Sequence, residues 1–572
     1  MANSQHRAHP AGGRTSFSAW CKRHAGALCL FVLVASVYSL WAGNEFIYDD
    51  HNMVNNQTGL YSLSDLGRVF SEPHDPVLPY YRPVTRTTFL LQKAWHGDNP
   101  LPFHLFNALL IGLAAVVLHL LLRLPVFAVP EVLALLAAAL FALHPVASSS
   151  VYPIASGRET LLPAFFMMAA IYSFLRPGRG WYILATVFLT LAIFSKEQAV
   201  VLAALFVLAD ALGVSADAPG RSVRRWLSRY WLIGGVYLVY FLLRFRLFAG
   251  REFHLSLADN PAVPLLSPVY ALQSIVAPFL ALVYEPMSVK AWLSPPRVAL
   301  AALAVLLLGL AVRKQWPASR RMALFWGGWF LLAMLPTSGL VAQDVHFEER
   351  YIFLSAAAAA GIGACVAASW WRDPSRRRLI TVLGAILIAA CGACTVNRGR
   401  YFRDDLVFYQ QWLRTSPDYF LPHHAMGTIL YKRGRAEEAA AYYRKAIAMK
   451  PDWPDSHLNL GLILVDQGKY GEAEEEMLAY VRLKPQSAKA HYSLGVVQTL
   501  SGKFSQAIGQ YEEALALEPH MAEAHHNLGC IYQQLEQYEK AADHYREALK
   551  INPGKANSRQ NLEDVSALLG KP

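Results

Sequence analysis

Asp49 and Asp50 are adjacent carboxylates that come directly after the first long apolar run of the sequence, which ends near Trp41. Acidic side chains this close to lipid are costly unless they face water or take part in chemistry. A carboxylate pair at the membrane surface can remove a proton from an acceptor hydroxyl or hold a metal ion. The pair can equally be a solvated loop or a helix cap, and these residues alone favour neither interpretation.

Further charged residues lie in short polar stretches between later apolar runs. One stretch holds His144, Arg158 and Glu159, and another holds Lys196 and Glu197. Neighbouring Lys and Glu residues between two apolar runs can form a structural ion pair, whereas ionisable residues at membrane depth are by default candidates for function. Both interpretations stay open for Lys196 and Glu197.

The composition places these residues in a membrane protein. Of 572 residues, 54% are hydrophobic and only 16% are charged, and the net charge is +11. Soluble domains carry about 25% charged residues. The Arg residues form short clusters between apolar runs, as expected for cytoplasmic loops. We therefore expect membrane lipid as a partner and no nucleic acid.

The apolar runs predict an all-α, polytopic helix bundle over residues 25–397. The basic residues 1–24 form a cytoplasmic tail, so the polar loop 43–101, with both aspartates, lies on the extracytoplasmic side. The predicted spans are 25–42, 103–123, 130–146, 160–175, 181–195, 198–213, 230–248, 297–313, 322–341, 351–370 and 379–396, about eleven in all.

Residues 266–295 are the weak point of this topology, because prolines interrupt the run. A single crossing would place the basic residues 313–321 outside, whereas a re-entrant or interfacial element keeps them inside. We favour the second interpretation. The loop that contains Glu348, Glu349 and Arg350 is then extracytoplasmic, and so is the whole C-terminal region.

The C-terminal region repeats with a period of 34 residues. Prolines recur from Pro417 to Pro553, glycines from Gly427 to Gly529, and a large residue recurs from Tyr443 to Tyr545. This pattern is typical of the tetratricopeptide repeat, which stacks helix pairs into an α-solenoid with a concave groove. We expect a connector at 398–416, repeats at 417–554, and a capping helix and tail at 555–572.

The position two residues before each repeat glycine holds Ala425, Asn459, Ser493 and Asn527. Polar side chains at this position can bind the backbone of an extended peptide in the groove. They can equally face solvent without a ligand, and the sequence does not decide between these alternatives.

Several short motifs, in order along nearly the whole chain, carry a family resemblance. They are Phe46-Ile47-Tyr48-Asp49-Asp50, Tyr81-Arg82-Pro83, Phe103-His104-Leu105-Phe106-Asn107, Leu143-His144-Pro145, Gly157-Arg158-Glu159, Ser195-Lys196-Glu197 and Glu349-Arg350-Tyr351. With the repeat tail, the chain resembles the transmembrane and tetratricopeptide-repeat-containing O-mannosyltransferases. These belong to the GT-C type of polytopic glycosyltransferases, which use lipid-linked sugars.

The resemblance implies a function and a set of partners. The donor would be a polyprenyl-phosphate sugar, with mannose expected, and a protein or peptide acceptor would bind through the repeats. The composition indicates a bacterial inner membrane with periplasmic repeats, or an endoplasmic reticulum membrane with lumenal repeats if the source is eukaryotic. The identities of the sugar and of the acceptor stay open.

The resemblance also implies roles for individual residues. Either Asp49 or Asp50 would remove the proton from a Ser or Thr hydroxyl as its oxygen attacks the anomeric carbon. Candidates for binding the donor phosphate are Arg158, Lys196 and Arg350, followed by Arg82. Supporting acids would be Glu159, Glu197, Glu348 and Glu349, with His104 and His144 as further candidates. No metal site is assigned, and metal dependence stays open.

Two other classes of protein compete with this interpretation. The membrane region could anchor a non-catalytic scaffold for an envelope or folding complex, although an anchor needs far fewer spans. Intramembrane charges would also fit a transporter, but no broken inverted repeat is visible in the sequence.

Overall fold

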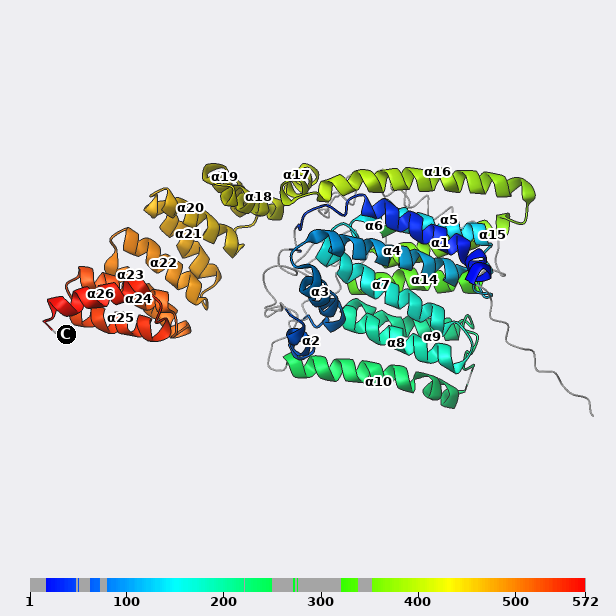
Figure 1. Ribbon diagram of the computed structural model, residues 1–572, viewed down its shortest axis with the longest axis horizontal. Coiled ribbons are helices and arrows are strands. Elements are labelled where there is room, and N and C mark those ends of the chain that lie inside the picture. The colour runs from blue at the N-terminus through cyan, green and yellow to red at the C-terminus, as the bar shows by residue number, and fades with distance from the viewer. Residues whose placement is uncertain are drawn as a thin grey trace, which may run out of the picture. The chain divides into compact units, whose positions relative to one another are not determined.

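A computed structural model describes residues 17–47, 50, 62–72, 80–220, 222–248, 271, 272, 275, 320–337 and 352–570. Within these residues the chain forms helices and turns, without a strand, which confirms the predicted all-α fold (Figure 1). The chain divides into two compact units, Met1–Ser416 and Pro417–Pro572.

The first unit is a bundle of mostly apolar helices. Its helices are α1 (Phe17–Ser39), α2 (Leu66–Ser71), α3 (Pro83–His96), α4 (Pro100–Leu122), α5 (Glu131–Leu143), α6 (Pro145–Ser148), α7 (Ile154–Phe174), α8 (Arg179–Ser195), α9 (Leu202–Ala211), α10 (Val223–Phe248), α14 (Arg320–Met334), α15 (Phe353–Trp370), α16 (Pro374–Gly399) and α17 (Asp405–Thr415). Short 3₁₀ turns at Leu63–Asp65, Glu197–Val201, Leu335–Thr337 and Arg400–Phe402 connect some of them.

The bundle is organised around α7. Helices α1, α4, α7 and α8 pack against one another in that order, and α5 packs against α4, α15 and α16 (Figure 1). In the apolar 18-residue stretch of α7, 89% of the residues are buried, whereas the corresponding shares in α10 and α16 are 17% and 11%. Helix α7 therefore lies at the core, and the exposed leucines and isoleucines of α16 suit contact with lipid.

Membrane-length helices support a membrane protein. Among the described residues, five helices are long and apolar enough to cross a membrane: Pro100–Leu122, Ile154–Phe174, Val223–Phe248, Phe353–Trp370 and Pro374–Phe402. Shorter apolar helices are His24–Ser39, Glu131–Leu143 and Arg179–Ser195. The expected span 198–213 is instead a 3₁₀ turn followed by the ten-residue α9. The expected span 297–313 and most of the proline-rich run lie outside the described residues, which lack 276–319. The expected total of about eleven spans therefore stays a prediction.

The second unit is a row of antiparallel helix pairs. Its helices are α18 (Phe420–Lys432), α19 (Ala436–Met449), α20 (Pro454–Asp466), α21 (Tyr470–Leu483), α22 (Ala488–Leu500), α23 (Phe504–Leu517), α24 (Ala522–Gln534), α25 (Tyr538–Ile551) and α26 (Ala556–Leu568). The second helix of each pair ends two residues before a repeat proline, because proline cannot continue a helix.

The repeat glycines make close helix packing possible. A Cβ atom on Gly427 would lie 2.9 Å from the ring of Tyr443, and one on Gly529 would lie 2.6 Å from the ring of Tyr545. The small and the large residue of the 34-residue period therefore face each other within one helix pair, as the sequence pattern predicts.

Candidate functional site

Asp50 holds the loop after α1 against the first turn of α7. Its Oδ1 accepts a hydrogen bond from Ala155 N at 2.6 Å, and its Oδ2 accepts from Ile154 N at 3.2 Å and Ile47 N at 3.1 Å. The first amides of a helix have no partner inside the helix, and a carboxylate there also interacts well with the helix dipole. Asp50 is fully buried and therefore caps a helix more than 100 residues away in sequence.

Asn107 connects α4 to the same first turn. Its Nδ2 donates to the carbonyl oxygens of Val151, Pro153 and Ile154, at 3.3, 3.4 and 3.1 Å. Its Oδ1 accepts from Nε of Arg158 at 3.3 Å. One amide side chain therefore fixes both the turn before α7 and the cation one turn into that helix.

Arg158 is enclosed by aromatic rings at the centre of this region. Its guanidinium carbon lies 4.4 Å from the ring centroid of Phe89 and 4.6 Å from that of Phe106, and Nη2 donates to the carbonyl oxygen of Phe103 at 3.2 Å. The side chain has no exposed surface. Cation–π contacts of this kind stabilise a buried guanidinium. The charge also lies close enough to Asp50 for a favourable electrostatic interaction.

Arg82 joins three elements through two carboxylates. Its Nη1 lies 2.6 Å from Oε2 of Glu159 on α7, and its Nε and Nη2 donate to Glu197, at 2.8 and 3.1 Å, after α8. Burial lowers the pKa of Arg82, but the two carboxylates raise it more, so the pKa is raised overall. The partner of Glu197 is thus an arginine 115 residues away, in addition to its neighbour Lys196.

The remaining candidates lie around this network. Nε2 of His104 donates to the carbonyl oxygen of Asn44 at 3.1 Å, which ties α4 to the loop before Asp50. Nδ1 of His144 accepts from Val146 N at 3.2 Å and caps α6, and Nε2 donates to the carbonyl oxygen of Ile275 at 3.1 Å. Lys196 is buried where α8 ends.

The structure therefore gathers six predicted residues around the first turns of α7. They are Asp50, Arg82, His104, Arg158, Glu159 and Glu197. Asp49, Glu348, Glu349 and Arg350 lie outside the described residues, and their roles stay predictions.

Two residues that position this network had no role in the sequence-based site. Asn107 closes the Phe-His-Leu-Phe-Asn motif, and its spacing of three from His104 places both on one face of α4. Gly157 must lack a side chain, because a Cβ atom there would lie 2.8 Å from the carbonyl oxygen of Ser150 and 3.2 Å from Nδ2 of Asn107. Both residues were visible in the motifs, but only their contacts reveal their task.

The repeat asparagines contact tyrosines of the solenoid. Nδ2 of Asn527 donates to the hydroxyls of Tyr511 and Tyr492, at 3.2 and 3.3 Å, and Asn459 hydrogen-bonds Tyr443. Ser493, one repeat later than Asn459, instead donates to the carbonyl oxygen of Lys489 in its own helix at 2.8 Å. Part of the hydrogen-bonding capacity of these asparagines is therefore used between repeats.

These contacts fix the charged side chain of Arg82 at the start of α3 and the backbone of the first turn of α7. No group of three or more His, Cys, Asp or Glu side chains that could hold a metal ion occurs among the described residues.

Comparisons with known proteins agree with the motifs. Models of the tetratricopeptide repeat match residues 424–498 and 522–555, and a TPR repeat model matches residues 499–536. Protein O-mannosyl-transferase TMTC4 of Mus musculus is 25% identical over 511 residues, which cover 74% of this chain and 66% of the relative. Protein O-mannosyl-transferase TMTC3 of the same species is 29% identical over 184 residues, 29% of this chain and 19% of the relative.

The chain thus spans just under two thirds of the length of the first relative and about a fifth of the second. Among solved structures, the crystal structure of MamA is 27% identical, covers 25% of this chain and 84% of its own, and has a TM-score of 0.25. The two O-mannosyl-transferases and the repeat models confirm the resemblance to repeat-containing O-mannosyltransferases, which the motifs indicated.

Proposed function

We propose that the chain is an integral-membrane glycosyltransferase that moves mannose from a polyprenyl-phosphate donor to a Ser or Thr hydroxyl of a protein, on the extracytoplasmic side. Similarity to two protein O-mannosyl-transferases supports the reaction class. The membrane-length helices support a lipid-linked donor, and the tetratricopeptide repeats support a protein acceptor.

The observation that carries the mechanism is the binding of the Asp50 carboxylate to three backbone amides. Asp50 has no exposed surface and already accepts hydrogen bonds from three backbone amides, so in this structure its carboxylate does not face a space where a substrate hydroxyl could reach it. We therefore assign the anchoring role to Asp50 and the general base to its neighbour Asp49. This division combines the two alternatives that the sequence left open for the pair, which are a helix cap and a carboxylate that acts as general base.

In the proposed reaction, Asp49 takes the proton of the acceptor hydroxyl while its oxygen forms a bond to the anomeric carbon. The bond between that carbon and the phosphate oxygen breaks, and the phosphate leaves with the electron pair. A single displacement inverts the anomeric carbon. Because the leaving phosphate is already ionised, the step needs no general acid.

The fixed positions of two arginines narrow the choice of phosphate ligands. Arg82 is held by two carboxylates, and Arg158 has no exposed surface. We assign these two a framework role and keep Lys196 and Arg350 as the cations that meet the donor phosphate. The repeats would bind the acceptor chain and so raise its local concentration for the membrane unit.

The test is transfer of labelled mannose from polyprenyl-phosphate mannose to endogenous proteins in membranes. Asp49→Asn is expected to abolish transfer at unchanged protein level. Asp98→Asn is the matched control, because Asp98 lies in the same predicted loop with a side chain that is 70% exposed. Full transfer by Asp49→Asn would remove the proposed mechanism, and absence of transfer by the unmodified chain would favour the scaffold.

A further inference from the structure

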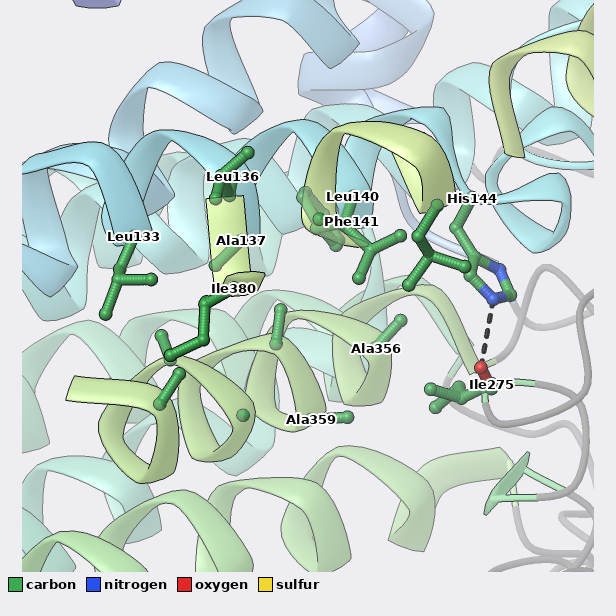
Figure 2. A pocket seen from close by; sticks show the side chains of 16 residues that line it. Leu133, Leu136, Ala137, Leu140, Phe141, His144, Ile275, Ala356, Ala359 and Ile380 are labelled. Atoms are coloured by element: carbon green, nitrogen blue, oxygen red, sulfur yellow. Dashed lines mark hydrogen bonds between the residues drawn. The ribbon is translucent and has the colours of Figure 1, made fainter. Parts of the chain in front are cut away.

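A partly open cavity of about 360 Å³ lies between α5, α15 and α16 of the membrane bundle (Figure 2). Leu133, Leu140 and Phe141 of α5 line one wall, and Ile380 of α16 lines another. Among the described residues that line the cavity, His144 alone has an ionisable side chain. It lies at one end of the cavity, where Figure 2 shows its hydrogen bond to Ile275.

The sequence of α15 explains why this space exists. The helix places alanine or glycine at positions 356, 359, 360, 363, 364 and 367, all on the cavity wall. These positions recur at spacings of three and four, so they form one face of the helix. Since such side chains fill little volume, the facing leucines of α5 cannot close the gap.

The lining decides what can fill the cavity. Water needs two to four polar partners to stay in a buried site. Both nitrogens of His144 already have hydrogen-bond partners, and the other described residues of the wall are apolar. Helices α15 and α16 are long and apolar enough to span the membrane. The occupant that these surroundings favour is therefore a hydrocarbon chain.

A short buried segment of the chain connects the His144 end of the cavity to the residues that bind Asp50. The carbonyl oxygen of Leu143, where α5 ends, accepts from Thr395 Oγ1 at 2.8 Å. Residues 144–153 are all buried and fold into α6 and two turns, and the next residue, Ile154, donates to Asp50. A chain that lies in the cavity with its head at His144 therefore directs that head toward the end of the bundle that holds Asp50.

We propose that this cavity binds the isoprenoid tail of the lipid-linked sugar donor, close to its phosphate. The inference rests on the proposed function. At about 30 Å³ for each non-hydrogen atom, the volume accommodates roughly a dozen atoms, which is two to three isoprene units. The remaining units of the tail would extend into the surrounding lipid.

The chain offers a matched pair of substitutions for the test. No atom lies within 4 Å of the place where a Cβ atom on Gly363 would sit, so the backbone there accepts a side chain, and Gly363→Leu adds four carbons to the cavity wall. Gly234 on α10 has equally open surroundings but does not line the cavity, so Gly234→Leu is the control. Thermal unfolding in detergent checks that both variants fold.

The experiment uses full-length protein in phospholipid vesicles and polyprenyl phosphate that carries a photoreactive diazirine in its second isoprene unit. Cross-linked peptides from α5 and α15 are expected in the unmodified chain and in Gly234→Leu. In Gly363→Leu their yield should fall roughly ten- to a hundredfold, because several CH₂ groups lose their burial. Equal yields in the two variants would overturn the proposal. Equal competition by unlabelled phosphatidylglycerol and unlabelled polyprenyl phosphate would also overturn it, since the cavity would then be a general site for acyl chains.

Sugar transfer measured in parallel separates this inference from the proposed function. In Gly363→Leu the KM for the donor should rise while kcat changes little, because the tail is bound equally in the ground state and the transition state. An unchanged KM alongside active transfer would refute the cavity as the tail site and leave the enzyme intact. Specific cross-linking without transfer in any variant would refute the enzyme and leave a binding site for polyprenyl phosphate.

Discussion

Replacing Asp50 by Asn tests whether this carboxylate anchors the loop or performs the chemistry. Asn offers one acceptor oxygen where Asp50 offers two, so the new NH₂ group must face at least one backbone N–H of Ile47, Ile154 or Ala155. Losing a charge-assisted hydrogen bond costs about 1.5–3 kcal/mol, and an unpaired buried donor costs about 1–3 kcal/mol. We therefore expect the first turn of α7 to lose about 3–5 kcal/mol of local stability.

Hydrogen exchange measured by mass spectrometry reports this loss directly. The amides of Ile154 and Ala155 have no partner inside α7, so their protection depends on Asp50. Local destabilisation of this size should speed their exchange by about two to four orders of magnitude. Asp49→Asn should leave the same amides protected while it abolishes sugar transfer. If Asp50→Asn leaves exchange unchanged but abolishes transfer, Asp50 is the base and the assignment of roles is wrong.

Three further substitutions test the framework and the repeats. Arg82→Gln removes the cation shared by the buried Glu159 and the partly exposed Glu197 and should cost about 3–5 kcal/mol, seen as a lower Tm in detergent. An unchanged Tm would contradict the role of this ion pair. Gly157→Ala places a methyl group against a backbone carbonyl oxygen and should cost about 1–3 kcal/mol, whereas Gly180→Ala, with nothing within 4 Å, should leave the Tm unchanged. A hydrogen bond to Glu476 raises the pKa of His457. The stability that this pair contributes is therefore complete below about pH 6.5 and is lost as the pH rises through the raised pKa of His457. Amide protection of α20 and α21 should therefore fall as the pH rises above 6.5, and a fall of the same size in His457→Gln would exclude this pair as its cause.

The solenoid could be predicted closely because its information is local. Each glycine and the large residue that packs on it, such as Gly495 and Tyr511, lie 16 residues apart within one helix pair. The proline that follows marks the end of that pair. Since each repeat contacts mainly its neighbours, the 34-residue period carries both the fold and its contacts.

The membrane region could be predicted less completely. Long apolar runs such as those of α4 and α16 indicate spans by themselves. They do not show which helix lies at the core, because in lipid both buried and exposed faces are apolar. The burial of α7 and the exposure of α16 therefore came from packing and not from hydrophobicity.

The sequence by itself determined the residue types of the candidate site, the apolar runs and the repeat period. Only the tertiary structure decided which polar groups meet: Asp50 accepts from the backbone amide of Ala155 across 105 positions, and Arg82 binds Glu197 across 115. Adjacency in sequence suggested an ion pair between Lys196 and Glu197. The attraction between two charges is strongest, however, where they approach closely in a medium of low dielectric constant, and for Glu197 that partner is Arg82. That partner is chosen by the packing of α3, α7 and α8, and no local pattern in the chain encodes it.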